Sequence, residues 1–178
     1  MATGAKYVVS YRRKREQKTD YRRRLDLLKS GLTRLIVRPS NKNITLQLVV
    51  YESNGDKIIG HAFSKELSGY GWSHSTSNLP AAYLTGLVLA KKVEGKVSGE
   101  IILDSGFHSS NKGSRIYAAV KGVIDGGLKV RVGDGVFPDE SRIKGEHISS
   151  HVERSKNITK DFEKARDSIL SSKGKKND

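Results

Sequence analysis

Cysteine is absent from this sequence of 178 residues, and proline (three residues), tryptophan (one) and methionine (one) are scarce. Without cysteine the chain forms neither disulfides nor a thiolate metal site, so an intracellular setting is permitted. No segment approaches the roughly 20 apolar residues that span a bilayer, and the N-terminus lacks the apolar core of a secretory signal. We therefore expect a soluble protein without a membrane partner. A mitochondrial transit peptide is a weaker alternative, because the basic N-terminal segment runs directly into the folded part.

Acidic residues are also few, and their scarcity is uneven along the chain. Thirty-three Lys and Arg oppose 19 Asp and Glu, which gives a net charge of +14. Residues 1–42 hold 13 basic and 3 acidic residues, residues 43–150 hold 12 and 11, and residues 151–178 hold 8 and 5. A nearly neutral body with a cationic arm is typical of a polyanion binder. We divide the chain into a basic arm with a short helix (1–31), an α/β domain (32–150), and a C-terminal helix and tail (151–178).

The arm contains the run YRRKREQKTDYRRRLDLLKSG at 11–31, with eight basic residues among its first fourteen. Such nearly unopposed cations neutralise phosphates, and the two tyrosines offer planar faces on which bases could stack. The alternative is a solvated charge run, but charged surface helices usually alternate in sign. The candidate RNA contacts of the arm are its aromatic and basic residues: Tyr11, Arg12, Arg13, Lys14, Arg15, Lys18, Tyr21, Arg22, Arg23, Arg24 and Lys29.

The second half of the arm predicts a helix that begins at Thr19 as N-cap and stops at Gly31. One narrow apolar side of this helix is expected to dock on the body, while at least two arginines face a ligand. That side consists of Tyr21, Leu25 and Leu28. Residues 1–18 have no apolar stripe, so we expect them to be disordered without a ligand.

Downstream of the arm, hydrophobic periodicity changes from helix to strand and back. It predicts strands at 35–37, 44–51, 57–63 and 100–106, helices at 80–92 and 116–124, an edge strand at 128–132, a loop-like stretch at 133–150, and a C-terminal helix at 158–169 with a frayed tail at 171–178. The order β-β-β-α-β-α predicts an α/β fold with a mixed sheet. Small residues at every fourth position, Ala82, Gly86 and Ala90, predict close approach of the first long helix to a neighbour.

Three loops are further candidates for RNA contact. The hairpin connection contributes Arg38, Ser40, Asn41 and Lys42, but a polar turn explains it equally well. The loop GYGWSHSTSN at 69–78 precedes a helix N-terminus, which favours a phosphate, and contributes Trp72, Ser75, Thr76 and Asn78. Its alternative is ordinary helix capping with a packed tryptophan. The segment SSNKGSR repeats this arrangement and contributes Lys112 and Arg115.

An enzyme is the competing class, because Asp104 follows a predicted strand and three histidines could serve as bases or ligands: His61, His74 and His108. Their spacing matches no metal motif, and the sequence has neither a phosphate loop nor a paired-carboxylate motif. We expect no catalysis, no cofactor, no metal and no small-molecule substrate, and we interpret Asp104 as a turn or cap residue. A general cation for DNA or anionic lipid is a second alternative.

Six blocks in one order resemble a known family. They are YRRKREQKTDYRRRLDLLKSG, RLIVRPSNKNITLQLV, GYGW, NLPAAYLTGLVLAKK, LDSGFHSSNKGSRIYAAVKGVIDGG and FPDESRIKGEHI. Together they resemble the 5S-rRNA-binding ribosomal protein eighteen family of the large subunit, in its archaeal and eukaryotic branch. The resemblance covers about residues 2–151, and no firm match extends beyond residue 153.

The resemblance implies a cytoplasmic ribosomal protein without enzymatic activity. It implies binding to 5S rRNA and 23S rRNA at the central protuberance, beside ribosomal protein five and other proteins of that region. It also implies a ribonuclease-H-like sheet with helices, which agrees with the predicted element order. RNA contacts carried over from the family fall on the arm, on residues 38–42 and on residues 72–78.

Overall fold

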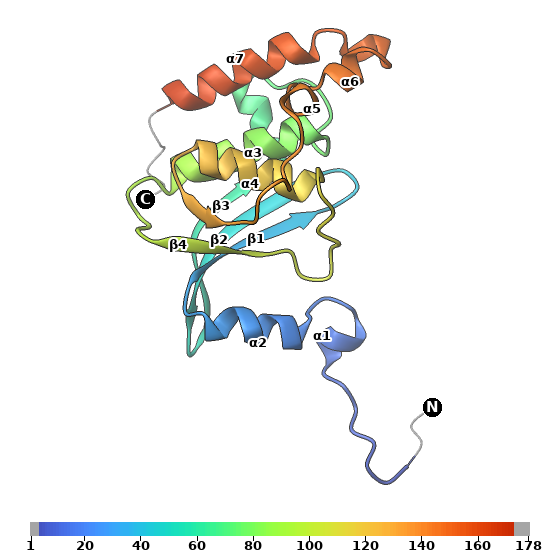
Figure 1. Ribbon diagram of the computed structural model, residues 1–178, viewed down its shortest axis with the longest axis vertical. Coiled ribbons are helices and arrows are strands. Elements are labelled where there is room, and N and C mark those ends of the chain that lie inside the picture. The colour runs from blue at the N-terminus through green and yellow to red at the C-terminus, as the bar shows by residue number, and fades with distance from the viewer. Residues whose placement is uncertain (1–3, 173–178) are drawn as a thin grey trace.

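The computed structural model describes residues 4–172, and a five-stranded sheet forms its centre (Figure 1). The sheet order is β3-β2-β1-β4-β5, with antiparallel β1/β2 and β2/β3 pairs and parallel β1/β4 and β4/β5 pairs. The strands are β1 (Thr33–Pro39), β2 (Ile44–Glu52), β3 (Gly55–Phe63), β4 (Glu100–Asp104) and β5 (Lys129–Arg131). The predicted α/β fold with a mixed sheet is confirmed, and β5 is the expected edge strand.

The alternation of side chains along β1 gives the sheet two different faces. Leu35 pairs with Leu48 and Val37 pairs with Leu46, and all four side chains are fully buried. Because successive side chains of a strand point to opposite faces, Arg34, Ile36 and Arg38 lie on the other face. One face of the sheet is therefore apolar, and the other carries charge.

Helices cover the apolar face, and the arm lies on the charged side (Figure 1). The covering layer consists of α3 (Leu79–Lys92) and α4 (Arg115–Asp125), with α7 (Ile158–Ser171) packed on α3. The arm contains α1 (Arg12–Arg15) and α2 (Tyr21–Lys29). None of the helices in the described part of the chain is long and apolar enough to cross a bilayer.

The helices α3 and α4 touch backbone to backbone. A Cβ atom added at Gly86 would lie 2.2 Å from the carbonyl oxygen of Ala119, and one added at Gly122 would lie 2.0 Å from that of Tyr83. Only glycine fits at such distances. The predicted close approach at Gly86 is confirmed, and its partner is α4.

The C-terminal helix is part of the body. Its predicted apolar residues are all buried: Ile158, Phe162, Ala165 and Ile169. This confirms the amphipathic helix. Of the expected frayed tail at 171–178, residues 173–178 lie outside the described residues.

The loop-like prediction for 133–150 is partly wrong, because this stretch contains α5 (Glu140–Lys144) and α6 (Glu146–Ser149). Helices of one turn are too short to show a hydrophobic period, and tertiary packing supports them instead. Ile143 is only 6% exposed, and Gly145 ends α5 at a φ of 84°. Two 3-10 helices, η1 (Ser64–Tyr70) and η2 (Glu153–Ser155), complete the elements.

Candidate nucleic-acid interface

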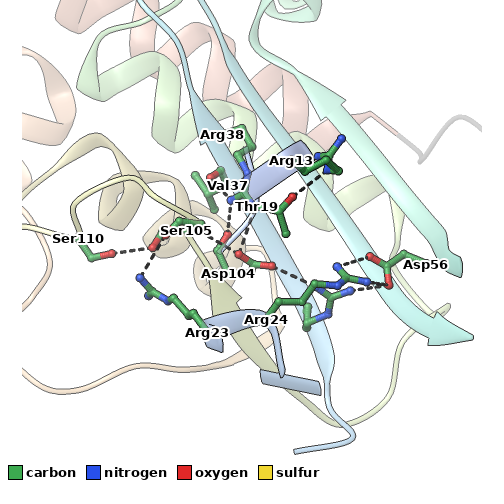
Figure 2. A network of polar contacts seen from close by, with 12 residues as sticks. Arg13, Thr19, Arg23, Arg24, Val37, Arg38, Asp56, Asp104, Ser105 and Ser110 are labelled. Atoms are coloured by element: carbon green, nitrogen blue, oxygen red, sulfur yellow. Dashed lines mark hydrogen bonds and ion pairs between the residues drawn. The ribbon is translucent and has the colours of Figure 1, made fainter. Parts of the chain in front are cut away.

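A chain of arginines and aspartates joins the arm to the charged face of the sheet (Figure 2). At its centre lies Arg34 on β1, whose side chain is 1% exposed. The guanidinium of Arg34 forms ion pairs with Asp56 at 2.7 Å and with Asp104 at 3.1 Å. Arg24 of the arm donates from both terminal nitrogens to the two carboxylate oxygens of Asp56, at 2.9 Å each. Such a bidentate pair fixes position as well as charge.

The charges of this network shift the pKa values of its outer pair. Burial alone would raise the pKa of the Asp56 carboxyl, but the guanidinium groups of Arg24 and Arg34 lower it by more. The hydrogen bonds to Asp56 in turn raise the pKa of Arg24. Both groups are therefore charged in the folded protein at neutral pH, and the arm is held by an ion pair.

The helix α2 begins one residue later than predicted. Asp20, not Thr19, is the N-cap, and its carboxylate accepts hydrogen bonds from the backbone N–H groups of Arg22 and Arg23 at 3.1 Å. Aspartate is the better cap because its charge also favours the positive end of the helix dipole. Thr19 instead accepts a hydrogen bond from Nε of Arg13 at 2.8 Å.

The predicted docking side of α2 is wrong for Tyr21 and Leu25, whereas Leu28 is half-buried. Tyr21 is 37% exposed and Leu25 is 55% exposed, and α2 has no buried residue. The helix contacts the body through its arginines, because Arg24 binds Asp56 and Arg23 donates to the carbonyl oxygen of Gly106 at 3.3 Å. The paired carboxylate is on β3, far along the sequence, so local periodicity gave no sign of it.

Residues 12–15 form one helical turn where the sequence predicted disorder. Glu16 pairs with Arg12 at 2.7 Å and with Lys18 at 2.9 Å, and hydrogen bonds from these two side chains lower the pKa of Glu16. Lys29 makes a long surface contact with Asp26 at 3.5 Å.

Within residues 11–31, three cations make no side-chain hydrogen bond or ion pair with any other described residue: Lys14, Arg15 and Arg22. All three are exposed. We call them the free cations of the arm, in contrast to Arg23 and Arg24, which hold α2 on the body.

A cleft of about 230 Å³ separates the arm from the charged face of the sheet. The cations that line it come from both walls: Arg13, Lys18, Arg23 and Arg24 from the arm, and Arg38 from β1. Asp20, Asp56 and Asp104 line it as well, but each already binds an arginine or a backbone N–H group. The unbalanced charge in the cleft is therefore positive.

Arg38 belongs to the same network rather than to an exposed loop tip. Its guanidinium donates to the backbone carbonyls of Val37 and Asp104, at 3.0 and 2.7 Å, and pairs with the Asp104 carboxylate at 3.1 Å. The tip of the hairpin loop is exposed at Ser40, Asn41 and Lys42.

The structure brings the three candidate loops together. Arg115 donates to the carbonyl oxygens of Ser40 and Ser77, at 3.1 and 3.0 Å. The hydroxyl of Thr76 donates to the carbonyl oxygen of Lys42 at 2.7 Å. One surface is thus formed by residues 38–42, residues 72–78 and the start of α4. From the sequence alone, these were three separate candidate segments.

Several residues of this surface have structural contacts. Trp72 is 3% exposed and donates from its indole nitrogen to the carbonyl oxygen of Ser75 at 3.1 Å, which favours the packing alternative. Asn78 caps α3 by accepting a hydrogen bond from the backbone of Ala81. Ser75 and Lys112 remain exposed.

Asp104 and His74, two of the residues considered for catalysis, have structural partners instead. Asp104 binds Arg34 and Arg38 and also accepts a hydrogen bond from the backbone N–H of Gly106 at 2.9 Å. The predicted turn role of Asp104 is confirmed, but its ion pairs with Arg34 and Arg38 were not predicted from the sequence. One feature of the sequence could have indicated these ion pairs: two arginines, Arg34 and Arg38, lie four residues apart and therefore on the same face of one strand. His74 lies 2.9 Å from Asp161, and among the described residues no group of three or more potential ligands could hold a metal ion.

Comparison with known proteins decides the family. The family model described as ribosomal large subunit proteins 60S L5 and 50S L18 matches residues 5–100, which include most of the arm, the first three strands and α3. The large ribosomal subunit protein uL18 of Methanothrix thermoacetophila is 48% identical over 170 residues, which cover 96% of this chain and 99% of that protein. The chain belongs to the uL18 family.

Other uL18 proteins are similarly close. That of Korarchaeum cryptofilum is 49% identical over 86% of this chain and 79% of its own length, and that of Halobacterium salinarum is 47% identical over 86% and 84%. The chain is therefore a constituent of the large ribosomal subunit, located with ribosomes in the cytoplasm. Membership of uL18, a structural family, confirms that it is not an enzyme.

Proposed function

We propose that this uL18 protein binds 5S rRNA and attaches it to 23S rRNA at the central protuberance, beside ribosomal protein five and other proteins of that region. One observation carries the proposal: among the cations of residues 11–31, two hold the arm on the body and three are free. Arg23 and Arg24 are the holding pair, and Lys14, Arg15 and Arg22 are free.

The two sets have different roles in this proposal. The free cations neutralise RNA phosphates and release counterions, which supplies affinity without reading sequence. The bidentate contact of Arg24 with Asp56 fixes the direction of α2 before RNA arrives, so less conformational entropy is lost on binding.

The joined loops offer a second surface. Asn41, Lys42 and Lys112 are exposed there, and the hydrogen bonds from Arg115 and Thr76 hold the backbone of the hairpin loop at residues 40 and 42. A cationic arm and a separate polar surface can grip a folded RNA at two places, which sets its register.

The experiment neutralises the free cations in the full-length chain, as the triple variant Lys14→Gln, Arg15→Gln, Arg22→Gln. Its matched control is Lys156→Gln, Lys160→Gln, Lys164→Gln, which removes the same charge from exposed positions just before α7 and in its first half. The dissociation constant for 5S rRNA is measured at several salt concentrations.

We expect the arm variant to reduce the slope of log affinity against log salt by about two to three, since each lost phosphate contact removes about 0.7–0.9. The control should keep the slope of the unmodified protein. Equal slopes for the two triple variants would contradict the proposal. Competition with duplex DNA of equal length tests the alternative of a general cation, which would prefer neither nucleic acid strongly.

A further inference from the structure

The arm exposes a pair of aromatic rings that contact each other. The ring centroids of Tyr11 and Tyr21 are 5.2 Å apart, with the planes tilted by 51°. Tyr11 is 73% exposed and Tyr21 is 37% exposed, and Leu25, one turn farther along α2, is 55% exposed. The rings stabilise each other, yet most of the apolar surface of this group faces water. An apolar group of this kind on a surface usually marks a binding site.

The charges around the pair define the ligand. Lys14 and Arg15 follow Tyr11 by three and four residues, Arg22 follows Tyr21 directly, and all three are the free cations. The acids of the arm have partners. Glu16 binds Arg12 and Lys18, and Asp20 binds the backbone at the start of α2. A ligand for this surface therefore combines a planar apolar group with negative charge, and a nucleotide has both.

We propose that Tyr11 and Tyr21 form a stacking platform for an unpaired base of the bound RNA. This inference rests on the proposed function and names the RNA feature that the arm selects. Because the two rings already contact each other, the base stacks on an outer ring face rather than between them. Bases within a duplex are covered on both sides, so the platform selects a bulge, a loop or a strand end.

The test compares two RNA hairpins with the same stem, one with a single bulged 2-aminopurine and one with 2-aminopurine in a base pair. The full-length protein is compared with the double variant Tyr11→Leu, Tyr21→Leu, which keeps apolar side chains at both positions. The matched control is Tyr7→Leu, Tyr51→Leu, because these two tyrosines are 54% and 56% exposed and stack on no described ring.

We expect the unmodified protein to bind the bulged hairpin about 5- to 100-fold more tightly than the paired one. A gain of this size is what stacking of one base on an aromatic side chain adds to the affinity. Binding should also quench the bulged 2-aminopurine. The Tyr11/Tyr21 variant should lose this preference and this quenching, but keep its affinity for the paired hairpin and the salt dependence of its 5S rRNA binding. The Tyr7/Tyr51 control should behave as the unmodified protein does.

Two results would overturn the platform while leaving the proposed function intact. One is an unmodified protein that binds both hairpins equally, and the other is a Tyr11/Tyr21 variant that retains the preference and binds 5S rRNA normally. The latter would assign the tyrosine pair to a protein partner instead. A failure of the unmodified protein to bind 5S rRNA would refute the proposed function itself.

Discussion

The arm helix α2 and the C-terminal helix α7 are attached in opposite ways. On one side of the sheet, α7 buries Ile158, Phe162, Ala165 and Ile169 against the helical layer. On the other side, α2 buries no residue and is held mainly by Arg24 on Asp56. Both helices are amphipathic in sequence, but only α7 buries its apolar side fully, whereas Leu28 of α2 is half-buried and Leu25 is exposed.

The difference assigns the two helices to different tasks. Apolar burial is insensitive to salt and contributes a large free energy, so α7 is a permanent part of the core. A partly exposed ion pair contributes little and competes with other charges, so α2 is positioned but replaceable. Tyr21, Leu25 and the free cation Arg22 of α2 remain exposed.

The largest effect is expected where α7 meets the core. Phe162 is 2% exposed, and its ring centroid lies 5.6 Å from that of Tyr83. The Phe162→Ala variant should lose about 3–5 kcal/mol of folding free energy. Leu25→Ala on α2 should stay within about 0.5 kcal/mol. Urea unfolding measures both. Similar losses for the two variants would erase the contrast between the helices.

The next effect concerns the carboxylate that holds α2. Asp56→Asn weakens the contacts of Arg24 and leaves the buried Arg34 with Asp104 as its one charged partner, which should cost about 1–3 kcal/mol of folding free energy. Amide hydrogen exchange should then rise in α2 but not in α7. Glu52→Gln, an exposed change on the neighbouring strand, is the control and should leave α2 protected. Unchanged protection in Asp56→Asn would show that other contacts hold the arm.

A smaller difference between α2 and α7 is expected in their response to salt. Between 0.05 and 1 M salt, the contact of Arg24 with Asp56 should weaken by less than about 1 kcal/mol, because both side chains are partly exposed. Amide exchange should therefore accelerate by up to about fivefold in α2 and stay constant in α7. An equal response of both helices would mean that apolar contacts hold α2 as well.

Low pH should also weaken the attachment of α2, because protonation of Asp56 removes its ion pair with Arg24. The folded pKa of Asp56 lies below its ordinary value of 3.8, so its contribution to stability is fully present above about pH 4. That contribution is lost as the pH falls through the lowered pKa. NMR chemical shifts of α2 should show this step, and Asp56→Asn should remove it. A step that persists in the variant would belong to another carboxylate.

The fold could be predicted where local periodicity and burial agree. In β2, Ile44, Leu46 and Leu48 alternate with polar residues and are fully buried, so period two predicted the strand correctly. The four apolar residues of α7 are another example. Where an element is one turn long, as in α5 and α6, no period exists to be detected.

The candidate site was less predictable, because its geometry depends on distant pairs. The sequence identified the arm as cationic, but it gave no sign that Arg24 would bind Asp56 or that Arg34 would bind Asp104, partners 32 and 70 residues away. Arginines with carboxylate partners and free arginines look alike in a sequence. The apolar stripe of Tyr21, Leu25 and Leu28 is ambiguous in the same way, because it predicts a docking side but serves an outside ligand equally well.

The most direct test of the central claim uses the absence of cysteine. A single introduced cysteine can be labelled uniquely with an iron chelate that cleaves nearby RNA. Ser10 in the arm and Ser168 on α7 are both exposed. With the Ser10→Cys protein bound to 5S rRNA, we predict strong, localised cleavage of the RNA, and with Ser168→Cys we predict none. Cleavage from the α7 position and not from the arm would contradict the account.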